Sequence, residues 1–237
     1  MIHRPLAHHA TPGFGPTIVF LPGYASDMQG SKALAVEAWA RASGRACLRF
    51  DYSGCGESPG DFEDGTLTAW RDDVLGLIDT VVEGPVTLVG SSMGGWIALL
   101  VALLRPTRVA ALVGVAAAPD FTDWGFTSQE RATLAHAGRL ERTSDYGPEP
   151  TVTTRAFWES GQASLLLGAP IAIDAPVRLI HGQRDPDVPW ANALTLARQL
   201  RSPDVQTILV KDGDHRLSRA ADIALILQMI EALPPCS

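Results

Sequence analysis

A serine between glycines stands where a short apolar run gives way to a longer one. Residues 90–94 read GSSMG, which matches the pattern Gly-x-Ser-x-Gly with Ser92 at its centre. The run PVTLV before it is typical of a strand, and WIALLVALL after it is typical of a helix. A serine in a sharp strand-to-helix turn leaves no room for Cβ atoms on its neighbours, which explains the glycines. Ser92 is therefore a candidate nucleophile, although the pattern also fits an ordinary turn before a helix.

A serine hydroxyl is a poor nucleophile unless a general base takes its proton, so Ser92 predicts a histidine and an orienting carboxylate in the order Ser, Asp, His. Five histidines do not fit this order. They precede the sharp turn at Ser92, which we call the elbow, or lie in a stretch without strands, or stand at the end of a strand before any suitable acid. These are His3, His8, His9, His136 and His181. His215, in the run GDHR after the last expected strand, satisfies the order. Its alternative interpretation is a surface loop histidine beside Asp214.

The candidate acids lie in the run HGQRDPDVP, residues 181–189, directly after the apolar run VRLI. Carboxylates there would stand in a loop at the carboxyl end of a strand, the edge where open α/β sheets build their sites. We favour Asp185. Asp187 is a close rival, although it could instead be an exposed residue in the turn before Pro189. Asp120, after an earlier strand, is a third candidate.

Attack on a carbonyl by Ser92 creates an oxyanion, which two backbone N–H groups must stabilise. One donor is expected at Met93, the residue after the nucleophile. The other is expected at Tyr24 in the loop FLPGYASD, where Gly23 lets the chain turn. Tyr24 could instead be an ordinary loop aromatic.

These side chains require a scaffold in which strands alternate with helices, and the chain has that pattern. Strands are predicted for residues 17–21, 46–50, 86–89, 110–115, 177–180 and 206–210. Helices are predicted for residues 32–42, 67–82, 93–104, 191–200 and 220–233. The expected strands are short and continuously apolar, as in a parallel sheet covered by helices on both faces. The fold class is therefore α/β.

The alternation breaks over residues 119–173, where no convincing strand is found. A gap of this length in a compact domain is usually functional or separately folded. Thr127 and Glu130 form a possible capping box for one helix, and residues 153–159 suggest another. The segment is interpreted as a helical cap inserted into the sheet domain.

The cap is rich in aromatic residues. Residues 120–170 hold six of the chain's 16 aromatic side chains, namely Phe121, Trp124, Phe126, Tyr146, Phe157 and Trp158. If they line the cleft, specificity should rise with acyl chain length, because each buried CH₂ contributes up to about 0.8 kcal/mol. Packing of the cap on the body explains them equally well. The cap also carries Arg131, Arg139, Arg142 and Arg155, which could pair with an anionic leaving group or simply occupy exposed helix faces.

Taken together, the motifs resemble the α/β-hydrolase family over nearly the whole chain. The resemblance rests on the Pro22-Gly23 turn, the run DYSGCGES, the elbow, HGxxDxxVP and the run DHR. It implies the α/β-hydrolase fold, a mostly parallel doubly wound sheet with a helical cap after the sixth-strand position, and it places the triad acid at Asp185. Together with the break in the alternation, it leads to the prediction of one domain over residues 1–237, with the cap at residues 120–172.

The motifs predict a serine hydrolase that cleaves carboxylic esters or thioesters through an acyl-enzyme, and the resemblance implies the acyl-thioesterase or acyl-glucuronide esterase type. The expected triad is Ser92, Asp185 and His215, and the expected oxyanion donors are Tyr24 and Met93. No cofactor and no metal are expected. The alternatives are a C–C bond or amide hydrolase on the same triad, and a ligand-binding protein that has negligible turnover.

Charge and cysteine content limit the partners. The 237 residues carry a net charge of −7, which disfavours nucleic acid because its recognition needs a basic surface. No run approaches the roughly 20 apolar residues of a membrane span, and the N-terminus lacks the apolar core of a signal peptide. Three cysteines without metal-ligand spacing indicate reduced thiols and a cytoplasmic location. A small-molecule ester or thioester is the expected partner, with an acylated protein as a further one.

Overall fold

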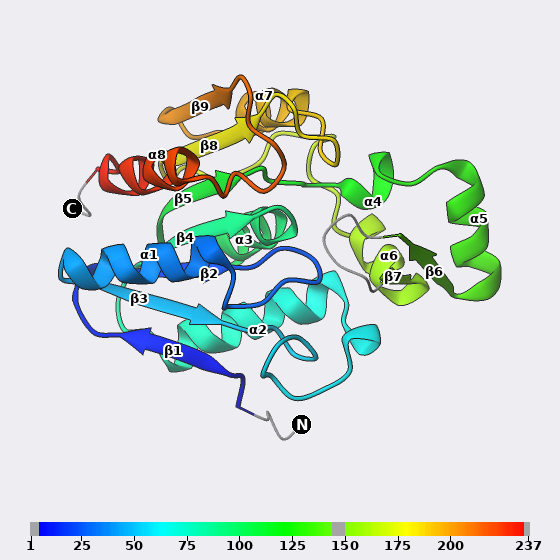
Figure 1. Cartoon of the computed structure of the whole chain (residues 1–237), viewed down its shortest axis with the longest axis horizontal. Helices are drawn as coiled ribbons and strands as arrows, with labels where there is room; N and C mark the ends of the chain where they lie inside the picture. Colours follow the sequence, from blue (N-terminus) through cyan, green and yellow to red (C-terminus); the bar gives the residue numbers. More distant parts are fainter. Residues whose placement is uncertain (1–4, 144–149, 235–237) are drawn as a thin grey trace.

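A twisted sheet of seven strands forms the centre of the molecule (Figure 1). The structure, a computed structural model, describes residues 5–143 and 150–234. In sheet order the strands are β1 (His8–Thr11), β3 (Arg45–Phe50), β2 (Phe14–Leu21), β4 (Val86–Ser91), β5 (Val109–Val115), β8 (Val177–Gly182) and β9 (Val205–Val210). All neighbouring strands are parallel except β1, which pairs with β3 in the antiparallel sense. The α/β class with a mostly parallel sheet is thus confirmed.

All six strands expected from the sequence are present, and β1 is the strand of this sheet that was not expected. Its sequence HHAT has no apolar run, and only Thr11 of its four residues is buried. An edge strand has one neighbour and a solvated face, so it needs no continuous apolar sequence. The two adjacent histidines, His8 and His9, therefore belong to the sheet edge.

Helices cover both faces of the sheet, as a doubly wound sheet requires. One face carries α1 (Ser31–Ala42) and α8 (Ala220–Glu231), and the other carries α2 (Leu67–Thr80), α3 (Met93–Leu104) and α7 (Ala191–Gln199) (Figure 1). Each layer encloses its own apolar core. The core beneath α2 and α3 contains the buried rings of Trp70 and Trp96, and α3 is buried along ten of its 12 residues.

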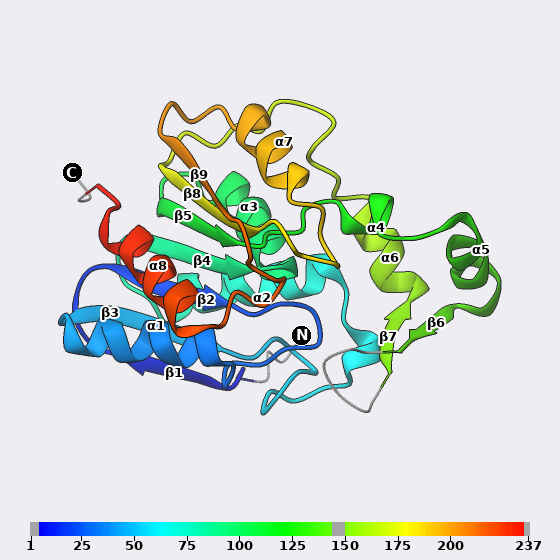
Figure 2. The ribbon, with the colours of Figure 1, turned by 45° about the horizontal axis from the view of Figure 1, so that its top comes forward.

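Between β5 and β8 the chain leaves the sheet and forms a separate lobe, which we call the cap segment (residues 120–172). It contains α4 (Phe121–Trp124), α5 (Ser128–Ala137), β6 (Arg139–Arg142), β7 (Thr151–Thr154) and α6 (Arg155–Gln162). Figure 2 shows it beyond the carboxyl ends of the parallel strands. The capping box of Thr127 and Glu130 starts α5 as expected.

The expectation that the cap region has no strand is wrong. β6 and β7 form a two-stranded antiparallel ribbon, so the cap segment is not purely helical. The ribbon pairs the sequences RLER and TVTT, whose residues are mostly exposed or half-buried, which is why no apolar run marks it. The helix expected at residues 153–159 starts later, because Thr153 belongs to β7 and Thr154 is the N-cap of α6.

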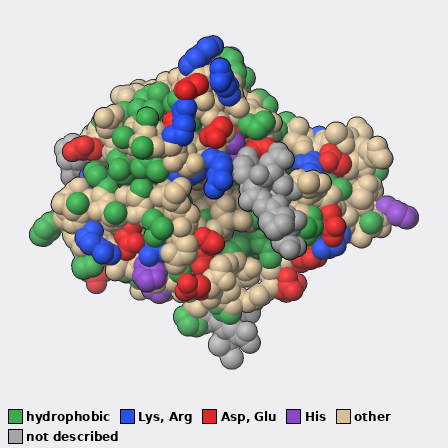
Figure 3. All heavy atoms as spheres, in the orientation of Figure 1, with side chains coloured by type: hydrophobic (Ala, Val, Ile, Leu, Met, Phe, Trp, Pro, Cys, Tyr) green, Lys and Arg blue, Asp and Glu red, His purple; other side chains and the backbone are tan. Residues whose placement is uncertain are grey.

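The surface and the helix lengths bear on possible partners. On the face drawn in Figure 3, basic and acidic side chains of the described residues are interspersed rather than gathered by sign. Among the described helices, α2 is the longest at 14 residues, and none is long and apolar enough to cross a membrane.

A buried ion pair fixes α1 against the sheet beside the loop after β2. The carboxylate of Glu37 on α1 accepts hydrogen bonds from Arg49 on β3 and from Thr11 on β1, and also pairs with Arg41. Arg49 in turn donates to the carbonyl of Met28 in that loop at 3.1 Å. Burial raises the pKa of Glu37, but the hydrogen bonds from Arg49 and Thr11 outweigh burial and leave the pKa below its usual value.

We expect Glu37→Gln to lower the free energy of unfolding by about 3–5 kcal/mol, because it leaves the Arg49 charge buried without its partner. Urea denaturation at neutral pH measures the change, and Glu159→Gln, at an exposed position of α6, is the matched control. The lowered pKa means that this contribution is present above about pH 4.3 and is lost as the pH falls through the folded-state pKa. Equal urea midpoints for the two variants would show that the ion pair contributes nothing.

Candidate active site

Ser92 lies in the sharp turn between β4 and α3, with backbone angles φ 54° and ψ −120°. A positive φ is rare for a residue other than glycine, so the turn is strained and is held by its surroundings. A Cβ on Gly90 would lie 2.4 Å from the carbonyl oxygen of Gly94, and a Cβ on Gly94 would lie 2.2 Å from that of Leu21. The two glycines of the motif are therefore required by close backbone contacts, as the sequence predicts.

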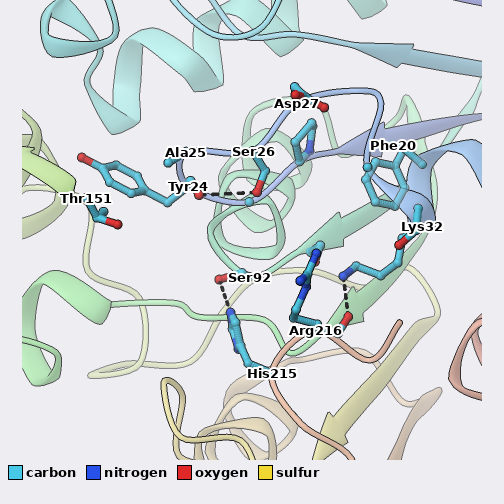
Figure 4. Close-up of a pocket in the computed structure, with 16 residues that line it drawn as sticks. Phe20, Tyr24, Ala25, Ser26, Asp27, Lys32, Ser92, Thr151, His215 and Arg216 are labelled. Carbon is cyan, nitrogen blue, oxygen red and sulfur yellow. Dashed lines mark hydrogen bonds between the residues drawn. The ribbon is translucent and has the colours of Figure 1, made fainter. Parts of the chain in front are cut away.

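The structure brings His215 and Asp185 to Ser92, although they are far apart in the sequence. His215 Nε2 lies 3.1 Å from Ser92 Oγ, and His215 Nδ1 lies 2.8 Å from Asp185 Oδ2. Figure 4 shows the first of these contacts within the cavity. The three residues follow β4, β8 and β9, which are parallel strands that end at one edge of the sheet. This chain of hydrogen bonds can move a proton from the serine hydroxyl to the imidazole.

The Asp185 carboxylate is fully buried, and its two oxygens have different partners. Oδ2 faces His215, whereas Oδ1 accepts the backbone N–H groups of Asp187 at 2.9 Å and Val188 at 2.8 Å. Burial raises the pKa of Asp185, but the hydrogen bonds from His181 and His215 outweigh it and hold the pKa well below its usual value. The group is thus a carboxylate at neutral pH and can stabilise a protonated imidazole.

The two rival acids have other surroundings than the buried carboxylate of Asp185. The side chain of Asp187 is exposed, and its backbone N–H serves Asp185. Asp120 is the N-cap of α4, and its carboxylate accepts the N–H groups of Leu166 and Leu167 at 2.8 and 2.7 Å. Asp120 therefore anchors the cap segment to the strand end after β5.

His181 was set aside by its position in the sequence, yet it contacts the candidate acid. Its Nε2 lies 3.1 Å from Asp185 Oδ2 and 3.1 Å from the carbonyl oxygen of Val188, and the residue is 1% exposed. Its Nδ1 is buried without a hydrogen-bond partner among the described residues. The Nε2–H tautomer satisfies both oxygens. The signal in the sequence was a histidine four residues before the acid, at the end of the same strand.

The expected oxyanion donors belong to two segments that approach each other at the elbow. Met93 is the first residue of α3, where a backbone N–H has no acceptor inside the helix. The loop after β2 passes close by, because a Cβ on Gly23 would lie 3.4 Å from the Cβ of Ser92. Tyr24 is anchored on the other side, where its hydroxyl donates to the carbonyl of Val152 at 2.6 Å and its ring packs against Phe157.

A cavity of about 220 Å³ opens beside Ser92 and His215. Its aromatic wall consists of Phe20 and Tyr24 from the body, and Thr151 is the described cap residue that lines it. The cap aromatics are placed elsewhere: Phe126 and Phe157 are buried, while the indole N–H groups of Trp124 and Trp158 donate to backbone carbonyls. Of the described rings, therefore, those of the cap serve packing. Tyr146 lies outside the described residues.

One group of side chains has ligand atoms close enough for a metal ion. Asp185, Asp187 and His215 offer atoms within 4.8 Å of one another, among the residues that the structure describes. A metal bound there would compete for the atoms that join Asp185 to His215. The hydrogen-bonded arrangement and a metal site at these residues therefore exclude each other.

Comparison with known proteins identifies the family. Residues 18–225 match the model of the alpha/beta hydrolase family. The chain is 41% identical over 232 residues to the human mitochondrial palmitoyl-protein thioesterase ABHD10, covering 96% of this chain and 76% of the relative. Among solved structures, mouse alpha/beta hydrolase domain-containing protein 10 superposes with a TM-score of 0.89 at 41% identity, covering 95% and 92% of the two chains. A protein from Agrobacterium vitis S4 gives 0.88 at 40% identity and covers 97% and 99%.

The contact of His181 with Asp185 predicts a positioning role. In His181→Phe, the Asp185 carboxylate no longer accepts a hydrogen bond from His181 and interacts more strongly with His215. The protonated form of the His215 imidazole is then stabilised more, so the acidic limb of the kcat/KM pH profile should move to higher pH. Turnover of an activated ester should fall about ten- to a hundredfold as Asp185 loses a fixed position. His181→Gln keeps a donor and should restore most of both properties. Identical pH profiles for both variants and the wild type would show that His181 only fills space.

Proposed function

This chain belongs to the α/β-hydrolase family and is an ester- or thioester-cleaving hydrolase, and we propose that Ser92, His215 and Asp185 carry its reaction. The observation that supports these roles is the continuous hydrogen-bonded chain from Asp185 through His215 to Ser92 beside the cavity. The serine at the elbow is what an acyl-enzyme mechanism requires.

In the first half of the proposed reaction, His215 Nε2 takes the proton of Ser92 Oγ as the oxygen attacks the acyl carbon. The Asp185 carboxylate holds the imidazole in the tautomer that leaves Nε2 free to accept, and stabilises the imidazolium that forms. The tetrahedral intermediate places its oxyanion towards the N–H groups of Met93 and Tyr24. His215 then gives its proton to the leaving oxygen or sulfur, and Ser92 remains acylated.

In the second half, water replaces the leaving group beside His215. The imidazole takes a proton from the water, the hydroxide attacks the acyl-enzyme, and the same two N–H groups hold the second oxyanion. Collapse returns the proton to Ser92 Oγ and releases the acid. Apart from the substrate and this water, the proposed steps use only groups of the chain.

We propose acyl thioesters and activated esters, including acyl glucuronides, as the substrate class. The human and mouse relatives at 41% and 42% identity are named palmitoyl-protein thioesterases, which supports thioesters and extends the candidates to acylated proteins. A cytoplasmic location stays a prediction from the cysteine content, because those relatives are named as mitochondrial.

The triad assignment is tested with p-nitrophenyl esters and a fluorophosphonate probe. Ser92→Ala and His215→Ala should each lower turnover by about 10³ to 10⁶, since the groups act as a unit, and Ser92→Ala should abolish labelling. Asp185→Asn should be about 10² to 10⁴ more damaging than Asp187→Asn, the matched control two residues away. A binding protein without turnover would show no burst of nitrophenol and no labelling. Near-equal effects of the two asparagine variants would reject Asp185 as the acid.

The cavity also limits the acyl group. Ligand pockets usually measure about 300–1,000 Å³, so a cavity of about 220 Å³ that must also receive part of the leaving group fits a short or medium acyl chain. We expect kcat/KM for p-nitrophenyl esters to rise from two carbons to about four to eight, by up to a few-fold per CH₂, and then to level off. A steady rise to 16 carbons would show that the acyl chain lies outside this cavity, and a maximum at acetate would show that no apolar acyl site exists.

A further inference from the structure

Two cationic side chains line the cavity beside the candidate nucleophile. Lys32 lies in the first turn of α1, and Arg216 directly follows His215 in the loop after β9. Figure 4 shows the two side chains next to each other, with Tyr24 and Thr151 across Ser92 on the opposite side. Lys32 Nζ donates to the backbone carbonyl of Arg216, which brings α1 and the His215 loop together.

The arginines of the cap segment do not line the cavity beside Lys32 and Arg216. Arg139 pairs with Glu63 and Glu141, and Arg142 pairs with Glu130 at 2.8 Å. Arg131 donates to the carbonyls of Phe126 and Asp123. Arg155 is exposed, and none of the four lines the cavity. Positive charge at the reaction centre therefore comes from Lys32 and Arg216.

Their position indicates which part of a substrate they meet. His215 protonates the leaving group, so the leaving atom must lie near Nε2. Arg216 adjoins His215, and Lys32 adjoins Arg216, whereas Tyr24 marks the oxyanion side. A leaving group that departs past His215 thus passes both cations.

We propose that Lys32 and Arg216 form a leaving-group subsite that binds a carboxylate carried by the alcohol or thiol part of the substrate. This inference rests on the proposed function and adds the charge of the leaving group to it. The carboxylate would lie between the ammonium and guanidinium groups while the acyl carbon faces Ser92.

The charge balance of the lining favours a single negative charge. Besides the two cations, Asp27 is the acidic residue among the described residues that line the cavity, and Asp214 and Asp222 lie close enough to act on the charge of Lys32. A carboxylate adds one negative charge beside the two cations, whereas a phosphate dianion would add a second one near these acidic residues. The ammonium of Lys32 has three N–H donors, and the Arg216 carbonyl takes one of them.

The environment of Lys32 makes the subsite sensitive to pH. Burial and the neighbouring Arg216 lower the pKa of Lys32 to about 8, while Asp214 and Asp222 act in the opposite direction. A lysine is charged below its pKa, so Lys32 should attract an anion at pH 7 and lose that attraction as the pH rises through about 8.

The test compares butyrate esters of 3- and 4-hydroxybenzoate with the butyrate esters of the corresponding hydroxybenzamides, which match them in size but carry no charge. The measured quantity is the ratio of kcat/KM for the anionic and neutral esters, so a general loss of activity cancels. For the wild type we expect a ratio of about 5 to 20 in favour of an anionic ester at low salt, expressed mainly in KM. The ratio should fall with added salt and between pH 7 and 9.

Variants assign the effect to the two residues. Lys32→Met and Arg216→Gln should each lower the ratio several-fold, and the double variant should bring it near one, whereas Lys32→Arg should keep it. The chain's only other lysine, Lys211, does not line the cavity. The control variant Lys211→Met should therefore leave the ratio at the wild-type value. Equal losses on both esters in Lys32→Met, with the ratio unchanged, would mean that Lys32 only holds the His215 loop and would overturn the proposal.

The remaining outcomes separate this inference from the proposed function. Hydrolysis of the neutral esters without preference for the anionic ones would reject the subsite and leave the hydrolase intact. Absence of hydrolysis for every ester, together with absence of fluorophosphonate labelling, would reject the triad instead. A phosphate-bearing leaving group, tested as the butyrate ester of 4-hydroxyphenyl phosphate, should be a poorer substrate than the carboxylate. The reverse order would overturn the assignment of the anion.

Discussion

The buried carboxylate of Asp185 is the constraint that organises the site. A fully buried charge is costly unless it is paired and hydrogen-bonded, and this one accepts from His215, His181 and two backbone N–H groups. Satisfying it requires the loops after β8 and β9 to lie in contact. The two loops are in close contact at Gly182, where an added Cβ would lie 2.3 Å from the carbonyl oxygen of Gly213. This contact between the two loops satisfies the Asp185 charge and also places His215 within hydrogen-bonding distance of Ser92.

The sequence predicts those parts of the molecule that leave a recognisable pattern in a short stretch of residues. The elbow is readable because the backbone contacts at Gly90 and Gly94 admit no side chain, and six strands are readable because burial on both faces demands continuous apolar residues. His215 follows from chain order alone. Asp185 and Asp187 could not be separated from residue types, because the distinction depends on which of two neighbouring side chains turns inward in one loop.

The features that the sequence missed depend on tertiary contacts instead. β1 and the ribbon of β6 and β7 have polar, exposed sequences and owe their pairing to a neighbour elsewhere in the chain. The role of the aromatic cap residues was open for the same reason. A ring that packs and a ring that lines a cleft look identical in a sequence, and the described rings of the cap pack. Net charge describes the whole chain and not the site, because this acidic chain still places Lys32 and Arg216 beside the cavity.

Tyr24 joins the cap segment to the chemistry, because one residue belongs to both. Its ring contacts Phe157 and Phe121 of the cap, with centroids 4.7 and 6.1 Å away, and its hydroxyl donates to Val152. Its backbone lies in the loop that packs on the elbow through Gly23, where the proposed oxyanion donor must stay fixed to within a fraction of an ångström. Burial raises the pKa of Tyr24, so the phenol stays protonated and keeps its donor to the cap. The sheet edge therefore positions Ser92, His215 and Asp185 by itself, whereas the place of the Tyr24 N–H depends on how the cap segment packs.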